Sequence, residues 1–343
     1  MKEFTYAKAG VDVSEEKKTY KKIGDILKET LRLREGKFGQ VLSEIGHYAG
    51  LIDIGGGKAL ALHSDGVGTK VLIAEMMNKY DTIGIDCVAM NVNDLICMGA
   101  EPVSLLDYLA VEKLGDHISE IAKGLAEGAK EAEIAIVGGE TALMPDVMRG
   151  FDLSAMSLGV VEKSKIITGE KIRTNDLVIG LESSGIHSNG LTLARKLLLL
   201  KYKVGEKIPE LGRTLGEELL EPTKIYVKLV LEIVNTCEVH GLANITGGAF
   251  SKLMRLGELA DVGFDLGNMP DPQPVFKLIQ KLGNVSDREM YRTFNMGIGF
   301  CVIIPENEKD KVMEICRKFE IKAWVVGKAI PEKKVLVKGI NVI

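Results

Sequence analysis

The hydrophobic pattern of this chain alternates between short apolar runs and longer stretches with apolar residues at helical spacing. Short apolar runs bounded by turn residues predict strands, and apolar residues that recur every three or four positions predict helices. In the first half, the predicted strands are residues 51–54, 59–63, 105–110, 134–137 and 152–161. Helices are predicted over residues 86–98 and from an N-cap at Asp116 to Ala129. The run 134–137 is expected to be a short buried strand.

A polar, turn-rich stretch at residues 163–176 interrupts this pattern and predicts a domain boundary. Beyond it, strands are predicted at residues 177–181, 299–304 and 323–328, and helices at 191–200, 226–234, 249–256 and 308–319. Strands alternate with helices in both halves, which predicts an α/β (α+β) fold. We expect two domains, residues 1–165 and 166–343.

Composition narrows the class of protein. The chain has 343 residues, 46% hydrophobic and 27% charged, with a net charge of −4. The charge gives no basic field for nucleic acid, and no apolar run approaches the ~20 residues of a membrane span. The N-terminal sequence lacks a signal-peptide pattern, and the five cysteines form no CxxC pair. We therefore expect a cytoplasmic protein that binds neither nucleic acid nor membranes.

Residues 64–70 read Ser-Asp-Gly-Val-Gly-Thr-Lys and hold the most informative chemistry. Glycines let backbone N–H groups turn toward an anion, and the Lys70 ammonium suits phosphate. A phosphate would repel Asp65 unless a divalent cation lay between them. The stretch thus favours metal–nucleotide binding, with an ordinary glycine turn as the alternative.

Two further carboxylates join this hypothesis. Asp94 lies late in the apolar helix predicted over 86–98, and Glu140 follows two glycines at the end of the run 134–137. Either could instead cap an element or pair with a lysine. Because hard oxygen ligands suit Mg²⁺, we predict that Asp65, Asp94 and Glu140 share a magnesium ion.

In the second half, two loops rich in glycine and hydroxyl residues each precede a predicted helix. A helix N-terminus with free N–H groups is an anion site. Residues 183–190 contain His187, which could be a general base, a phosphate donor or a structural histidine. Residues 246–248 form the second loop. In a third run, residues 290–297, Arg292 could clamp a substrate oxygen or lie on the surface.

The common nucleotide signatures GxxxxGK[ST] and GxGxxG between strand and helix are missing, which argues against P-loop and Rossmann sites. The assembled motifs, in order and over nearly the whole chain, instead resemble the phosphoribosylformylglycinamidine cyclo-ligase family. They lie at residues 6–12, 64–70, 81–86, 92–95, 99–102, 106–108, 137–142, 183–190, 222–228, 246–248 and 289–295. Many family members have a third glycine where this chain has Ala249.

The resemblance implies ATP-dependent ring closure of formylglycinamidine ribonucleotide to aminoimidazole ribonucleotide in purine synthesis. It also implies a homodimer in which the N-terminal sheets of two subunits pair into a β-barrel, with ATP sites near that interface. ATP would phosphorylate the formamide oxygen, and the amidine nitrogen would then displace phosphate. A related small-molecule kinase, such as a thiamine-monophosphate kinase, is the alternative; a non-catalytic ATP-binding scaffold would be expected to lack the carboxylates.

We predict the following site residues. ATP, with Mg²⁺ on Asp65, Asp94 and Glu140, is expected at Asp65, Gly66, Val67, Gly68, Thr69, Lys70, Asp94, Gly138, Gly139, Glu140 and Thr141. The substrate is expected at Ser184, His187, Ser188, Asn189, Gly190, Thr246, Gly247, Gly248, Arg292 and Asn295. His187 is the candidate for proton transfer.

Overall fold

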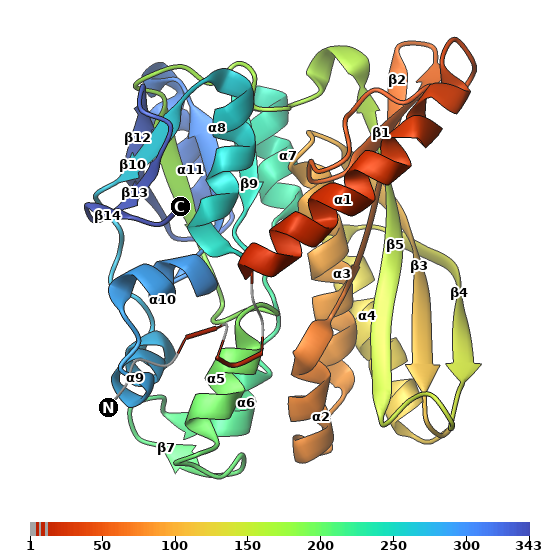
Figure 1. Cartoon of the computed structure of the whole chain (residues 1–343), viewed down its shortest axis with the longest axis vertical. Coiled ribbons are helices and arrows are strands. Elements are labelled where there is room, and N and C mark those ends of the chain that lie inside the picture. The colour runs from red at the N-terminus through yellow and green to blue at the C-terminus, as the bar shows by residue number, and fades with distance from the viewer. Residues whose placement is uncertain (1–4, 7, 11–12) are drawn as a thin grey trace.

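The computed structural model describes residues 5–6, 8–10 and 13–343, the latter without the side chains of residues 13–17. Two sheets lie side by side, each with helices packed on it (Figure 1). The first sheet ends at Glu162 and the first strand of the second begins at Leu177. The predicted boundary between residues 165 and 166 falls in the connecting segment.

The first sheet has five strands in the order β1-β2-β5-β3-β4. These are β1 (Gly50–Gly55), β2 (Lys58–Gly66), β5 (Phe151–Glu162), β3 (Glu101–Val111) and β4 (Ala135–Leu143). Only β3 and β4 pair in parallel, and α4 (His117–Ala132) connects them. In β5, buried and exposed residues alternate, so one face of the sheet is covered by helices and the other is open.

The second sheet has seven strands in the order β14-β13-β10-β12-β6-β11-β9. They are β6 (Leu177–Glu182), β9 (Gly241–Asn244), β10 (Gly263–Leu266), β11 (Ile298–Ile304), β12 (Ala323–Ile330), β13 (Val335–Val337) and β14 (Ile340–Asn341). Its helices are α5 (Leu191–Leu198), α6 (Leu215–Leu219), α7 (Val227–Thr236), α8 (Met254–Ala260), α9 (Pro274–Gly283), α10 (Asp287–Thr293) and α11 (Lys309–Lys318). A separate two-stranded ribbon joins β7 (Lys207–Ile208) and β8 (Arg213–Thr214).

Helix α3 (Asp81–Ile96) is the central element of the first domain, and it is buried from Asp86 to its end. It packs on α4 at very short range, because a Cβ added at Gly84 would lie 2.0 Å from the Leu125 backbone nitrogen. Its amides reach into the second domain, where Asn93 donates to the Lys224 carbonyl oxygen and accepts from the Tyr226 N–H. The buried polar residues of α3 therefore join the two domains.

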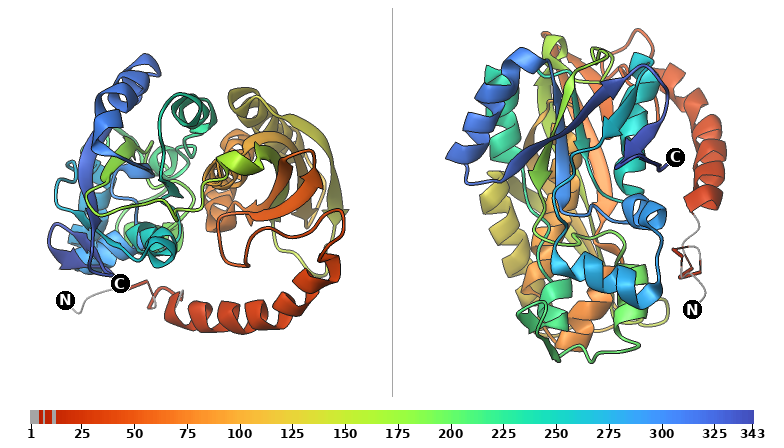
Figure 2. Two further views of the ribbon diagram at one scale, coloured as in Figure 1. Left: turned by 90° about the horizontal axis from the view of Figure 1, so that it is seen from above. Right: turned by 90° about the vertical axis from the view of Figure 1, so that its left-hand side faces the viewer.

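The first half of the chain contains two further helices, α1 (Val13–Leu31) and α2 (Val71–Met77). Helix α2 follows the 64–70 stretch, and α1 lies across the junction of the two domains (Figure 2). Neither was among the elements expected from the hydrophobic pattern. Among the described residues, no helix is long and apolar enough to cross a membrane.

Most predicted elements are confirmed, with shifted ends. One prediction is wrong: residues 134–137 do not form a buried strand, because β4 is a sheet edge whose side chains are almost all exposed. The helix expected at 86–98 begins earlier, at Asp81, and the helix expected at 249–256 is a 3-10 turn, η4 (Ala249–Leu253), followed by α8. Ala249 has a φ of 44°, a left-handed conformation that glycine adopts more easily.

Candidate functional site

Asp65 does not lie in a loop, as the glycines implied, but near the end of β2. Its backbone N–H donates to Asn91 Oδ1 and its carbonyl oxygen accepts from Asn91 Nδ2, at 3.2 and 3.1 Å. These two bonds fix the strand end against α3. Burial, and then the negative charge of Asp94, raise the pKa of the Asp65 carboxyl.

Asp94 lies on the same helix as Asn91 and is 5% exposed. Its Oδ1 accepts from Asn244 Nδ2 at 2.7 Å, and its Oδ2 lies 3.5 Å from His63 Nε2. Asn244 ends β9 of the second domain, so Asp94 is held at the domain junction. The structure therefore brings Asp65 and Asp94 together, as predicted.

Glu140 does not join them within one chain. Gly66, Ser154, Tyr108 and Glu140 occupy one register row across β2, β5, β3 and β4. Residues paired in register share a face and neighbours along a strand alternate, so Glu140 projects from the open face and Asp65 from the face covered by α3. Three strand spacings of about 4.8 Å also separate Glu140 from β2.

The prediction that one ion binds all three carboxylates is therefore corrected for the single subunit. Within the part of the chain that the structure describes, no group of three or more histidine, cysteine, aspartate and glutamate side chains is arranged to hold a metal ion. The sequence could not show this, because it depends on the register of three strand pairs.

Lys70 also differs from its predicted role. Its Nζ lies 2.6 Å from Asp86 Oδ2, and both side chains are completely buried. The same ammonium donates to the Glu221 carbonyl oxygen at 2.5 Å. Lys70 thus ties α3 to the second domain instead of presenting its charge to a triphosphate.

The other residues of the stretch lie at the end of β2 and in the turn that follows it. Gly66 ends β2, Val67 is buried, and Gly68 begins a 3-10 turn with a φ of 71°. A substituted Gly68 would be strained in that conformation. Thr69 Oγ1 lies 3.1 Å from Thr192 Oγ1 on α5, which adds another contact between the domains.

The loop at residues 183–190 is anchored by buried polar contacts. Ser188 Oγ donates to Asp86 Oδ1 at 3.1 Å, and Ser184 Oγ donates to the Pro222 carbonyl oxygen at 2.5 Å. Asn295 accepts from Ser183 Oγ through its Oδ1 and donates to the Gly185 carbonyl oxygen. Asn295 is thus committed to holding this loop.

The two predicted substrate loops meet. A Cβ at Gly247 would lie 2.9 Å from Asn189 Oδ1, which places the second loop directly against the first. At Gly190 a Cβ would lie 2.5 Å from the Phe294 ring, so the backbone approaches that ring closely. Gly248 precedes η4 with a φ of 82°, and Arg292 is half-buried on α10.

His187 is buried and has a φ of 64°. Its Nε2 accepts from the Ser184 N–H at 3.2 Å, and its Nδ1 is buried without a partner among the described residues. Burial lowers the pKa of His187 to about 3, with smaller contributions from Lys70 and Lys224. A neutral imidazole of such low basicity is a poor general base near neutral pH.

A cavity of about 660 Å³ opens beside Asp65 and Asp94. It lies between the two domains, since Lys252 and Arg255 of the second domain line it together with His63 of β2. Residues 43–50 and Tyr20 of α1 are also among the residues that line it. His47, Tyr48, Lys252 and Arg255 were not predicted, because no motif or spacing marks them.

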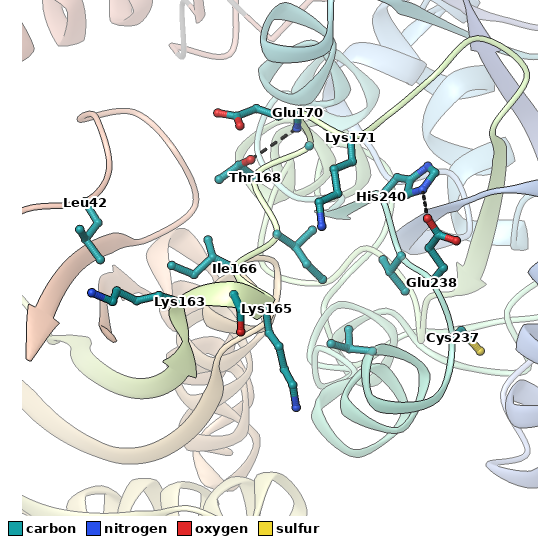
Figure 3. Close-up of a pocket in the computed structure, with 15 residues that line it drawn as sticks. Leu42, Lys163, Lys165, Ile166, Thr168, Glu170, Lys171, Cys237, Glu238 and His240 are labelled. Atoms are coloured by element: carbon teal, nitrogen blue, oxygen red, sulfur yellow. Dashed lines mark hydrogen bonds and ion pairs between the residues drawn. The ribbon is translucent and has the colours of Figure 1, made fainter. Parts of the chain in front are cut away.

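A second cavity, of about 560 Å³, lies behind the segment that connects the domains. Lys163, Lys171 and His240 are among its lining side chains (Figure 3). His240 Nδ1 lies 2.6 Å from Asp176 Oδ2, and His240 Nε2 lies 3.0 Å from Glu238 Oε1. None of the predicted site residues lines this cavity, whereas Asp65 and Asp94 line the first one.

Comparison with known families defines the class. Residues 46–161 match the N-terminal domain of AIR synthase related proteins, and residues 173–339 match the C-terminal domain of the same family. The chain therefore belongs to the AIR synthase related family.

Within that family, the chain is similar to phosphoribosylformylglycinamidine cyclo-ligases. The protein of Pyrococcus horikoshii is 53% identical over 340 residues, covering 98% of this chain and 99% of that protein. The protein of Methanocaldococcus jannaschii is 51% identical over 337 residues, covering 96% and 93%. The chain thus belongs with the cyclo-ligases, as its motifs implied.

Solved structures share the fold at lower identity. A thiamine-monophosphate kinase from Stenotrophomonas maltophilia has a TM-score of 0.66 at 19% identity, covering 91% of this chain and 96% of that one. T. maritima PurL complexed with ADP has a TM-score of 0.61 at 17% identity, covering 88% of this chain and 45% of that one. These likenesses support the two-domain α/β architecture.

Proposed function

We propose that this chain converts formylglycinamidine ribonucleotide and ATP into 5-aminoimidazole ribonucleotide, ADP and phosphate. The observation that carries the proposal is the interdomain cavity in which Asp65 and Asp94 face Lys252 and Arg255. Carboxylates for a metal and cations for phosphate are thereby brought together from two domains. Identity of about half the residues with cyclo-ligases over nearly the whole chain supports the choice of reaction.

We assign the metal and triphosphate end to the first domain. Asp65 and Asp94 are two acidic groups in a largely buried place, and burial, followed by repulsion from Asp94, raises the pKa of Asp65. Such a pair fits Mg²⁺, with phosphate oxygens and water completing the shell. When bound, the ion would neutralise phosphate charge and orient the γ-phosphoryl group. The backbone of residues 66–69 lies beside Asp65 and is assigned to the phosphates.

We assign the ribonucleotide to the second domain. The loops that contain Asn189 and Gly247 touch one another, so a single ligand can contact both. Ser184, His187, Ser188 and Gly190 shape the first loop, and Thr246 and Gly248 shape the second; Arg292 stays a candidate clamp. Asn295 acts by positioning the first loop.

Two displacement steps follow from this placement. The formamide oxygen attacks the γ-phosphorus, and the bond from that phosphorus to the bridging oxygen breaks, so that its electrons leave with ADP. The amidine nitrogen then attacks the activated carbon, phosphate leaves with the former formamide oxygen, and the proton that the nitrogen loses goes to the departing phosphate. Ring closure is intramolecular, so a folded substrate conformation supplies much of the rate advantage.

We further propose a homodimer through the open face of the first sheet. Leu106, Tyr108 and Met156 project from this face and are 38%, 44% and 44% exposed. Apolar side chains gathered on one exposed sheet face are typical of an interaction surface. In such a dimer, Glu140 and the glycines before it would face the partner, so their part in an ATP site would be played across the interface.

The proposal is tested by incubating the protein with Mg-ATP and formylglycinamidine ribonucleotide. Aminoimidazole ribonucleotide and ADP in equal amounts are expected. ADP formed with a phosphorylated, uncyclised product would contradict ring closure and favour a kinase, the activity of a structural relative. No ADP would reject both.

A further inference from the structure

Two cations of the second domain line the same cavity as the acidic pair of the first. Lys252 lies on η4 and Arg255 follows three residues later on α8. Lys252 Nζ is 5.7 Å and Arg255 Cζ 5.4 Å from the centre of the Tyr48 ring. Both side chains line the cavity that contains Asp65 and Asp94. A cation over an aromatic face is held in place without its hydrogen-bonding capacity being used.

Lys252 is the better placed of the two. Its side chain is half-buried, whereas Arg255 is exposed. Its Nζ donates a hydrogen bond to Thr246 Oγ1. Burial lowers the pKa of Lys252, and the charges of Asp94 and Asp65 act in the opposite direction. The Lys252 ammonium therefore interacts electrostatically with both carboxylates.

The Lys252 ammonium nevertheless has N–H groups that are available for further hydrogen bonds. An ammonium carries three hydrogens, and Thr246 accepts one. Among the described residues, Lys252 forms no ion pair within 4 Å. Lys70, in contrast, is buried in its ion pair with Asp86. In the same cavity, the Tyr48 hydroxyl is buried and has no hydrogen-bond partner among the described residues. Unused donors beside two carboxylates are suited to a ligand that carries both a metal ion and anionic oxygens.

We propose that Lys252 binds the phosphoryl group while it passes from ATP to the formamide oxygen. This inference rests on the proposed function and deepens it. Asp65 and Asp94 belong to the ATP side, and Lys252 follows directly on the loop assigned to the ribonucleotide. The residue thus lines the cavity between the two domains, beside the carboxylates of the ATP side.

The chemistry favours a further cation there. Charge spreads over the three equatorial oxygens of the phosphoryl group while its bond to ADP breaks and its bond to the formamide oxygen forms. The Lys252 ammonium donates hydrogen bonds to those oxygens and keeps its protons throughout. Catalysis comes from stabilising charge that develops in the transition state, in a site preorganised by Tyr48 and Thr246.

The experiment compares Lys252→Gln and Lys252→Arg with Lys281→Gln, a control on the exposed side of α9 in the same domain. Turnover is measured at saturating Mg-ATP and formylglycinamidine ribonucleotide, and the binding of each is measured by calorimetry. Lys252→Gln is expected to lower kcat about 100- to 1,000-fold, as for loss of one preorganised donor. Binding of both substrates should change less than about threefold, because uniform binding is unaffected. Lys252→Arg should recover part of kcat, and the control should match the wild type.

Two results would overturn the inference. One is a kcat for Lys252→Gln within about threefold of the wild type, since a lost transition-state contact must lower turnover. The other is an equal loss in the Gln and Arg variants with weakened ribonucleotide binding, which would mean that Lys252 only holds Thr246. Should Lys252→Gln fail to fold, the folded Lys252→Arg enzyme decides by its kcat and binding. Asp94→Asn tests the proposed function separately from the role of Lys252. If this variant stays fully active, the metal assignment itself fails.

Discussion

Lys70 Nζ and Asp86 Oδ2 form a completely buried ion pair, 2.6 Å apart, at the junction of the two domains. Asp86 Oδ1 also accepts hydrogen bonds from the Thr223 N–H, Thr223 Oγ1 and Ser188 Oγ. One carboxylate thus satisfies partners on three segments, two of them in the second domain. This cluster fixes the first substrate loop relative to α3.

Lys70→Met is expected to destabilise the protein strongly. It leaves the Asp86 charge buried and unpaired, a change that costs about 3–5 kcal/mol. Chemical denaturation measures the loss in the free energy of unfolding. Lys130→Met is the matched control, because Lys130 forms an exposed pair with Glu127 that is worth less than about 1 kcal/mol. Equal, small effects in both variants would show that the buried pair does not hold the domains together.

His187 should remain uncharged throughout the range in which the enzyme works. Its folded pKa is about 3, against 6.5 for the free side chain. Histidine NMR should therefore show no titration of His187 between about pH 5 and 9. A midpoint near 6.5 would contradict the burial argument.

The same shift affects stability in a defined direction. The unfolded chain binds a proton at His187 below about pH 6.5 and the folded chain does not until about pH 3. His187 thus favours the folded state fully above pH 6.5, and stability falls as the pH drops, by up to about 1.4 kcal/mol per pH unit. A His187→Asn variant should lose this part of the acid dependence in denaturation measured from about pH 4 to 7.

The raised pKa of Asp65 predicts that Mg²⁺ competes with a proton. Affinity for Mg²⁺ should rise with pH through the titration of Asp65, because binding requires the ionised carboxylate. The free energy of unfolding should change in the opposite direction. The folded pKa of Asp65 lies above the unfolded value of 3.8, so this free energy falls as the pH rises from the unfolded to the folded pKa. Asp94→Asn should lower the Asp65 pKa and weaken Mg²⁺ binding, as followed by carboxyl NMR and metal titration. Asp53→Asn is the control, because Asp53 on β1 pairs with Lys163 and does not line the cavity.

Met156→Asp should separate the proposed dimer. A charge in the middle of the open sheet face would be buried on association, which is costly without a partner. Light scattering is expected to give the mass of a dimer for the wild type and of a monomer for the variant. Leu200→Asp, at a well-exposed position just beyond α5, should leave the mass unchanged. A monomeric wild type would contradict the assembly.

Mixed dimers test the role of Glu140. If Glu140 serves the ATP site across the interface, Glu140→Gln and Asp94→Asn subunits should each be inactive alone. Mixed together, they form dimers with one intact site, which restores about a quarter of wild-type activity at random pairing. Without recovery, Glu140 would act within its own subunit or not at all, and full activity of Glu140→Gln would remove it from the site.

The amino-acid sequence by itself determined the class of fold and the family. Alternating strands and helices follow from local hydrophobic periods, and the ordered motifs, such as Gly-Gly-Glu-Thr at 138–141, are legible without coordinates. Asp65 and Asp94 were also found in this way, because glycines follow Asp65 and asparagines precede Asp94. The helices α1, α2, α6, α9 and α10 were missed.

Only the tertiary structure decided which charges meet. Strand register placed Glu140 on the face opposite Asp65, and helix packing enclosed Lys70 with Asp86. It also brought Lys252, which no motif marks, to the carboxylates from a separate domain. These relations depend on contacts between residues far apart in sequence, and a lysine in a conspicuous motif has the same local pattern whether it meets a phosphate or a buried aspartate.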